Sequence, residues 1–320
     1  MLRFAIIGTS RIAEQFAAAV AECNCAEATA VYSRTIENAQ RFADVYGIPG
    51  RITSLEELAS SQDFDAVYVA SPNSCHFEHS VMMLRGKKHV LCEKPIATCA
   101  EELHQMLRVA EENGVVLLEA SMHMFSPGLE QLRSLLPEVG TIRRASFVMN
   151  QYSSRYDSFK QGETHNIFSK EHAGGALNDL GIYCVEIMTA LFGEPESLVS
   201  SMIYLRTGVD GQGAIIAKYD GFLVELSYSK ISQSVTPCAV QGEEGSLVFS
   251  WPSIIDKIDV VKRNGEKRQV ICMGSENQMV YEIQAFSDIV NEPKKAEPYN
   301  RCSLMAQSVM DQAKAFDPPG

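Results

Sequence analysis

Three side chains in this 320-residue sequence could together carry out proton and hydride chemistry: Lys94, Asp179 and Tyr183. Lys94 follows Glu93 at the end of a predicted strand, and its charge lowers the pKa of a neighbouring proton donor. Asp179 and Tyr183 are four residues apart, so on a helix they share a face. Hydride exchange with a carbinol carbon requires a group that gives or takes the hydroxyl proton, and a tyrosine assisted by a lysine can do this. The three residues therefore predict an alcohol–carbonyl redox site, with Tyr183 as acid–base group and Asp179 orienting it or the substrate.

Each of these residues also has an ordinary structural explanation. Glu93 and Lys94 could form an ion pair in a surface turn, Asp179 could cap a helix, and Tyr183 could be a half-buried amphipathic side chain. A dinucleotide-sensing regulatory protein without turnover is the main alternative from another class, because fold alone does not establish function. A Rossmann-type methyltransferase would leave the lysine and the tyrosine without a role. Since a pure binding protein has no need of all three side chains, their combination favours an enzyme.

A short glycine turn lies between the first predicted strand, Arg3–Ile7, and the first predicted helix, Ile12–Glu22. In a dinucleotide site the first glycine permits the tight turn and the third position packs the helix on the strand. Gly8 and Ala13 fill these positions, whereas Ser10 replaces the second glycine. An ordinary strand-to-helix turn is the alternative. The cofactor contacts predicted in this turn are Gly8, Thr9, Ser10, Arg11 and Ile12.

The ends of later strands add further cofactor candidates. About 20 residues after the glycine turn, an NAD site carries an acid for the ribose hydroxyls, but this chain reads Ser33-Arg34-Thr35. The guanidinium of Arg34 suits a 2′-phosphate, which predicts NADP(H), with NAD(H) as the alternative. Arg34 could instead stack on adenine or lie in solvent. The candidates that follow two further strands are Ser71, Pro72, Asn73, His76, Glu93 and Lys94.

The first part of the chain alternates between short apolar runs and segments of helical period, which is typical of βαβ units and a parallel sheet. We therefore expect an α/β Rossmann domain, doubly wound, over residues 1–121. The expected strands are Arg3–Ile7, Ala28–Ser33, Ala66–Ser71, His89–Cys92 and Val115–Glu119, and the expected helices lie near Ile12–Glu22, Glu37–Tyr46, Phe77–Arg85 and Ala100–Asn113.

From Ile142 onward the pattern changes to strands without long helices between them, separated by turn signals such as Asp220-Gly221 and Asn264-Gly265. The expected strands are Ile142–Asn150, Leu198–Leu205, Ala214–Tyr219, Leu223–Ser229, Ser246–Phe249, Ile258–Lys262 and Arg268–Cys272. They predict an α+β domain over residues 122–320 with a large, mainly antiparallel open sheet. We leave open whether its C-terminal helix packs back on the first domain. Alternating side chains give the sheet two unlike faces, one for helices and one for a partner subunit.

Composition narrows the choice of partners. The net charge of −12 and the pI near 5.1 argue against a nucleic-acid or anionic membrane partner, because both require clustered basic residues. The nine cysteines are scattered, mostly in apolar runs, so we expect a reducing compartment and no metal site. The N-terminus enters a strand directly, without a signal-peptide pattern, and no apolar stretch could span a bilayer. We expect a cytoplasmic protein with a small-molecule substrate.

Taken in order, these motifs resemble the glucose-fructose oxidoreductase, inositol dehydrogenase and MocA family, over essentially the whole chain. The motifs are Gly8-x-Ser10-x-x-Ala13, Glu93-Lys94-Pro95 and Gly174-Gly175-x-Leu177-x-Asp179-x-Gly181-x-Tyr183. The tyrosine is similar to the branch of dimeric dihydrodiol dehydrogenase and sugar 1-dehydrogenases, whereas inositol dehydrogenases usually carry a histidine there. The resemblance implies Lys94, Asp179 and Tyr183 as the catalytic set on a sugar, polyol or diol, with Lys94 touching the nicotinamide ribose. It also implies homodimers or higher oligomers through the open sheet face.

Two departures from the family concern the substrate. Met124 stands where sugar-active relatives often have an arginine, and the segment His165–His172 also lacks one. A pocket of Tyr152, Arg155, Tyr156, His165 and Asn166 would offer donors and acceptors to hydroxyl groups, although the same residues could form a polar loop. The candidate substrate contacts are His123, Tyr152, His165 and Asn166.

Overall fold

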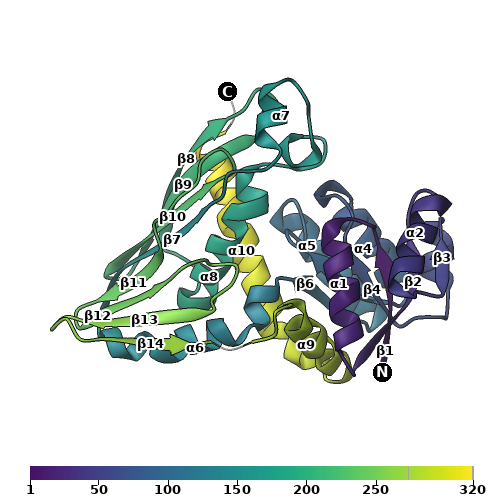
Figure 1. The fold of residues 1–320 in the computed structure, drawn as a ribbon, viewed down its shortest axis with the longest axis horizontal. Helices are drawn as coiled ribbons and strands as arrows, with labels where there is room; N and C mark the ends of the chain where they lie inside the picture. The colour runs from purple at the N-terminus through teal and green to yellow at the C-terminus, as the bar shows by residue number, and fades with distance from the viewer. Residues whose placement is uncertain (273, 319–320) are drawn as a thin grey trace. The chain divides into compact units, whose positions relative to one another are not determined.

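The computed structural model describes residues 1–272 and 274–318, and the chain divides into two compact units. Unit 1 combines Met1–Met122 with Ser275–Leu304, and unit 2 combines His123–Gly274 with Met305–Gly320. Figure 1 colours both units along the chain. Among the described residues, every helix is too short or too polar to cross a lipid bilayer.

Unit 1 contains a six-stranded sheet in the order β3-β2-β1-β4-β5-β6, and each neighbouring pair is parallel. Its strands are β1 (Leu2–Ile7), β2 (Ala26–Tyr32), β3 (Gly50–Ile52), β4 (Ala66–Val69), β5 (His89–Glu93) and β6 (Leu117–Ala120). Its helices are α1 (Arg11–Glu22), α2 (Ile36–Tyr46), α3 (Leu55–Ser60), α4 (His76–Arg85), α5 (Ala100–Asn113) and α9 (Met279–Asn291). The strand order reverses between β1 and β4, and ligands of open α/β sheets bind at the carboxyl ends of the strands beside such a point.

The predicted doubly wound domain is confirmed, with two omissions. Helix α5 has the predicted bounds and ends at Gly114, whose φ of 67° is left-handed. The sequence did not predict β3 or α3. Strand β3 has three residues, of which Ile52 alone is buried, so no alternating pattern marks it.

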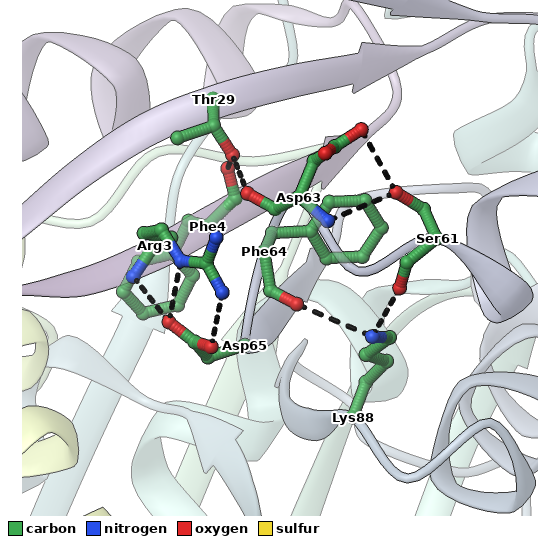
Figure 2. Close-up of polar contacts among 8 residues, drawn as sticks. All are labelled: Arg3, Phe4, Thr29, Ser61, Asp63, Phe64, Asp65 and Lys88. Carbon is green, nitrogen blue, oxygen red and sulfur yellow. Dashed lines mark hydrogen bonds and ion pairs between the residues drawn. The ribbon is translucent and has the colours of Figure 1, made fainter.

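Charged side chains link the amino ends of three adjacent strands (Figure 2). Arg3, in β1, donates to both carboxylate oxygens of Asp65, at 3.0 and 2.7 Å, and Asp65 directly precedes β4. Lys88, which precedes β5, is buried and donates to the backbone oxygens of Ser61 and Phe64. These contacts stabilise the sheet at the edge opposite to the carboxyl ends of the strands.

Helix α9 comes from the C-terminal part of the sequence but belongs to unit 1, where it packs against α1 (Figure 1). The Phe286 ring of α9 lies 5.8 Å from the Phe4 ring of β1, and Phe4 lies 5.4 Å from Phe16 of α1. The sequence pattern assigns this segment to residues 122–320. Its contacts with the first sheet span most of the chain, so no local pattern reveals them.

Unit 2 contains an eight-stranded sheet in the order β14-β13-β12-β11-β7-β10-β9-β8. Its strands are β7 (Ile142–Asn150), β8 (Ser197–Tyr204), β9 (Asp210–Tyr219), β10 (Phe222–Ser229), β11 (Cys238–Gly242), β12 (Gly245–Phe249), β13 (Lys257–Lys262) and β14 (Lys267–Ile271). The mainly antiparallel sheet is confirmed, and β7 and β10 form its parallel pair. The sequence did not predict β11, a short strand that ends at a glycine.

The two faces of this sheet differ, as predicted. Three helices contribute buried residues to the core on one face: α6 (Pro127–Leu135), α8 (Ile182–Phe192) and the second half of α10 (Glu297–Phe316). The opposite face of β8 and β9 carries exposed apolar side chains, including Val199, Ile203 and Ile216. Figure 1 shows α8 and α10 beside the same sheet.

Candidate functional site

The glycine turn after β1 requires a glycine for two reasons. The φ of Gly8 is +115°, and a Cβ atom on this residue would lie 2.6 Å from the carbonyl oxygen of Ala70. The Gly8 amide also donates to the carbonyl of Tyr32 at 3.1 Å. The turn therefore lies between the ends of β2 and β4, and Ala13 of α1 packs, fully buried, behind it. Gly8 thus makes the tight turn that the first glycine of a dinucleotide site provides.

The start of α1 adds donors to the same turn. Ser10 occupies the N-cap position, is exposed, and makes no capping bond through its side chain. The first amides of a helix have no partner within the helix, and the helix dipole makes this end favourable for an anion. Thr9 and Ile12 are partly exposed beside it, and Arg11 is exposed.

After β2, the three residues predicted to read the ribose have different environments. Ser33 is buried and its amide donates to Ile52, while the hydroxyl of Thr35 accepts from the Asn38 amide at 3.4 Å as the N-cap of α2. Arg34 is exposed. Of the three, Arg34 has the side chain that fits a 2′-phosphate, whereas the other two stabilise the local fold.

His76 connects the loops that follow β4 and β5. Its Nδ1 lies 2.8 Å from the Pro95 oxygen and its Nε2 lies 2.9 Å from the Ser71 oxygen. Burial lowers the pKa of His76, so at neutral pH one ring nitrogen donates and the other does not. The sequence missed His79, whose Nδ1 lies 3.0 Å from the Ser71 hydroxyl. His76 thus holds the two loops together, and its direct contact with a cofactor stays a prediction.

Glu93 and Lys94 do not form an exposed turn. Glu93 is buried, accepts from the hydroxyl of Tyr68 and from the Lys94 amide, and has its pKa raised to about 7 by burial. Within the described run Val90–Ala97, Lys94 is the one residue that is not buried. The surface-turn alternative is therefore wrong. The lysine directly follows β5, at the same edge of the sheet as Gly8.

In unit 2, Asp179 and Tyr183 lie on one continuous helical segment. A π-helical turn, η5 (Leu177–Gly181), leads directly into α8, and such turns are frequent at functional sites. Between Gly175 and Thr189, all of which the structure describes, Asp179 and Tyr183 are the two residues that are not buried. Over this stretch, the positions that are not buried thus carry one carboxylate and one phenol.

The sequence did not reveal why this helix begins where it does. Gly175 has a φ of +121°, and a Cβ atom there would lie 2.2 Å from Oδ1 of Asp210. The other oxygen of Asp210 accepts from the Leu177 amide at 2.7 Å. Asp210 is buried at the start of β9. Because Gly175 has no Cβ atom, the Asp210 carboxylate can lie close enough to bond to the backbone at the start of the helix.

Lys230 is a second functional candidate that sequence reasoning missed. It directly follows β10, its side chain is 4% exposed, and its ammonium donates to Oδ2 of Asp179. A lysine at the end of an apolar strand, in Tyr228-Ser229-Lys230, was the available signal. Asp179 is thus an ion-pair partner and not simply a helix cap.

His123, a predicted substrate contact, lies beside Tyr183. The centres of the two rings are 5.2 Å apart at an interplanar angle of 63°, and Nε2 of His123 lies 3.3 Å from Oε2 of Glu186. The histidine and the glutamate are 1% and 2% exposed. His123 therefore packs with the helix that carries Tyr183, and its contact with a substrate stays a prediction.

The remaining substrate candidates gather around α7 (Tyr156–Lys160). The Tyr152 hydroxyl donates to Asp157 at 2.7 Å and accepts from Lys160 at 3.0 Å, and Nε2 of His165 lies 2.6 Å from the Ser158 hydroxyl. Asn166 begins the short turn η4 (Asn166–Phe168). Because these polar groups pair with one another, the polar-loop alternative describes their arrangement well.

Two family models match most of the chain. Residues 2–121 match a model described as "Oxidoreductase family, NAD-binding Rossmann fold", and residues 131–248 match the "GFO/IDH/MocA C-terminal domain". The two matches correspond to the sheet of unit 1 and to much of the sheet of unit 2.

Individual proteins are similar over nearly the full length. Scyllo-inositol 2-dehydrogenase (NADP(+)) IolU of Bacillus subtilis is 39% identical over 316 residues, covering 98% of this chain and 96% of the relative. Trans-1,2-dihydrobenzene-1,2-diol dehydrogenase of Xenopus laevis is 33% identical, covering 78% and 76%. The crystal structure of KijD10, a 3-ketoreductase from Actinomadura kijaniata in complex with NADP and TDP-benzene, aligns with a TM-score of 0.88 over 99% of this chain and 98% of that chain. At 23% identity, this last likeness shows the fold.

Proposed function

Because the chain belongs to the GFO/IDH/MocA family of oxidoreductases, we propose that it interconverts a CH–OH group and a carbonyl on a small cyclic polyol, sugar or diol, with NADP(H) as the preferred cofactor. One observation carries this proposal. Between Gly175 and Thr189, the two residues that are not buried are Asp179 and Tyr183, a carboxylate and a phenol. A phenol can transfer a proton to or from a substrate hydroxyl group, and a carboxylate on the same helical segment can orient either group.

The proposed cofactor role of unit 1 is supported by the turn at Gly8 and by the exposed N-terminus of α1. A bound nicotinamide supplies or accepts the hydride. The amides of Thr9 to Ile12 bind the pyrophosphate, and the exposed guanidinium of Arg34 binds the 2′-phosphate. NADP(+) is also the cofactor in the name of the B. subtilis relative.

In the proposed reaction, the phenol of Tyr183 takes the proton from the substrate hydroxyl or returns it to the carbonyl oxygen. The carboxylate of Asp179 orients the phenol and the substrate hydroxyl, and the ammonium of Lys94 binds a ribose hydroxyl of the cofactor. A positive charge near a phenol favours its deprotonated form, so Lys94 also assists the proton transfer. The proposed substrates are cyclic polyols, sugars and diols because the names of the relatives include an inositol and a dihydrodiol dehydrogenase.

A substrate panel tests the proposal. The purified protein is incubated with inositols, aldoses and trans-diols, each with NADP+ and with NAD+, while the absorbance of the reduced nicotinamide is followed. We expect turnover with at least one cyclic substrate, and more efficient turnover with NADP+. Tight binding of the dinucleotide without turnover across the panel would favour the dinucleotide-sensing alternative instead.

A further inference from the structure

Lys230 lies in unit 2 in a position that the sheet holds rigidly. Its amide donates to the carbonyl of Gly211 at 2.9 Å, and its own carbonyl accepts from the Ser153 amide at the same distance. The residue therefore continues the pairing of β10 on both sides, and its flexible stem is enclosed by protein. The location of its ammonium group is set by the sheet, not by solvent.

The ammonium lies among carboxylates from different elements. It donates to Asp179 on η5, and its charge also acts on Asp210 at the start of β9. Burial raises the pKa of Asp210, and the bond from the Leu177 amide and the charges of Lys314 on α10 and of Lys230 oppose that rise. Tyr204 and Tyr228 also face Asp210, and burial raises the pKa of both phenols, so they are neutral at physiological pH.

A buried ammonium group is costly unless carboxylates and hydrogen bonds compensate for its lost hydration. An apolar residue of similar volume would fill this position without that cost. The charge of Lys230 is directed at Asp179, which is one of the two residues between Gly175 and Thr189 that are not buried. A role beyond packing follows, because the charge stabilises the ionised form of a carboxylate that solvent can still reach.

We propose that Lys230 is a positioning residue for the acid–base site, holding the Asp179 carboxylate ionised and in one orientation on the helix that it shares with Tyr183. The inference rests on the proposed function. Lys230 acts through Asp179 and touches neither cofactor nor substrate. A carboxylate beside a cation stays ionised at a lower pH than a carboxylate without one. Asp179 can therefore accept a hydrogen bond from the substrate hydroxyl, or from the tyrosine, over a wider range of pH.

The test compares Lys230→Met, which removes the charge at similar volume, with Lys230→Arg, which keeps it. Lys88→Met is the matched control, because Lys88 is another buried lysine, but it donates to backbone carbonyls at the amino edge of the first sheet. For each variant, kcat and KM are measured against pH with the best substrate of the panel, dinucleotide binding by fluorescence, and the thermal midpoint by calorimetry.

For Lys230→Met we expect kcat to fall at least tenfold, and the acidic limb of the kcat/KM profile to move up by about one pH unit, as for a carboxylate that loses an adjacent cation. Dinucleotide binding should be unchanged. Lys230→Arg should restore the wild-type acidic limb, even where its geometry lowers kcat. Lys88→Met should lower the thermal midpoint and leave the pH profile as in the wild type.

A wild-type pH profile in Lys230→Met, with a lowered thermal midpoint like that of Lys88→Met, would show a structural role and overturn the inference. Failure of the inference and of the proposed function can be told apart through Tyr183→Phe. If Tyr183→Phe loses turnover while Lys230→Met keeps the wild-type profile, the inference alone fails. If Tyr183→Phe retains full turnover, the proposed function fails and the inference fails with it.

Discussion

The imidazole of His123 and the carboxylate of Glu186 form a buried pair, with Nε2 and Oε2 3.3 Å apart. Glu186 is three residues beyond Tyr183 on α8, and His123 belongs to the short helical turn η2 (Met122–Phe125), 63 positions earlier in the chain. The histidine ring also packs against the ring of Tyr183 in a T-shaped arrangement. This pair therefore links the entry of the chain into unit 2 with the helix that carries the phenol.

Replacing one residue of this pair should destabilise the protein more than replacing both. His123→Phe retains an aromatic ring but leaves the buried Glu186 carboxyl group without its histidine, and an unsatisfied buried polar group costs about 1–3 kcal/mol. The double variant His123→Phe/Glu186→Leu should recover much of that free energy of unfolding, because neither polar group is then buried without the other. Urea unfolding of the wild type, both single variants and the double variant measures the coupling. Strictly additive losses would show that the two side chains do not interact.

Tyr183→Phe should lower kcat on the order of a hundredfold or more, because the ring remains and the transferable proton is lost. The dissociation constant of NADPH should stay close to that of the wild type, since this residue lies outside the cofactor turn. Steady-state kinetics and fluorescence titration measure the two quantities. Tyr46→Phe on α2 is the control, and its turnover should be that of the wild type. An unchanged kcat in Tyr183→Phe would remove the acid–base assignment.

Arg34→Ala should weaken NADPH binding on the order of tenfold to a hundredfold, as expected for the loss of a charge-assisted hydrogen bond. NADH has no 2′-phosphate, so its dissociation constant should hardly change. Arg41→Ala is the control, because Arg41 lies on α2, shortly after Arg34, is exposed and bonds to Asn38. Equal losses for both dinucleotides in Arg34→Ala would indicate stacking on adenine instead.

The stability of the protein should fall as pH rises from about 5 to about 7, in part because of Glu93. Burial raises the pKa of Glu93 from its ordinary value of 4.5 to about 7. In this interval the folded state binds more protons than the unfolded state, so the stabilising contribution is complete below pH 4.5 and is lost as pH passes through 7. The loss attributable to this group is on the order of 3 kcal/mol.

Glu93→Gln should flatten this slope, whereas Glu37→Gln, at an exposed site on α2, should leave it unchanged. Glu282 on α9 contributes in the same direction, because it is fully buried, its carboxylate oxygens have no hydrogen-bond partner among the described residues, and burial raises its pKa. Urea unfolding at half-unit pH steps measures the slope. A wild-type slope in Glu93→Gln would contradict the assignment.

We propose that a second copy of the chain covers the exposed apolar face of the sheet in unit 2. Ile203 of β8 is 53% exposed and Val199, on the same strand, is 47% exposed. Light scattering after gel filtration should therefore give a mass of at least twice 35.3 kDa. The variant Val199→Lys/Ile203→Lys should shift it to the monomer, whereas Val45→Lys on α2 should not. A monomeric wild type, or oligomers unaffected by the two lysines, would contradict this proposal.

The amino-acid sequence alone determined most of the strands of both sheets, the glycine turn at Gly8, and the spacing of Asp179 and Tyr183. These features are local. Hydrophobic periodicity and turn chemistry act over a few residues, so they can be read without knowing the fold. The same local reading placed a lysine after the strand that ends at Glu93, but it could not show that Glu93 itself is buried against Tyr68.

Only the tertiary structure decided which charges neutralise one another. Lys230 meets Asp179 across 51 residues, and Asp210 reaches the Leu177 amide across 33. The parallel pairing of β7 with β10 likewise joins distant segments. No periodic pattern in the sequence predicts such contacts, because each partner alone resembles an ordinary polar residue at the end of a strand or helix. Burial gives these charges their significance, since a charge removed from water requires a specific partner, and burial is a property of the folded chain.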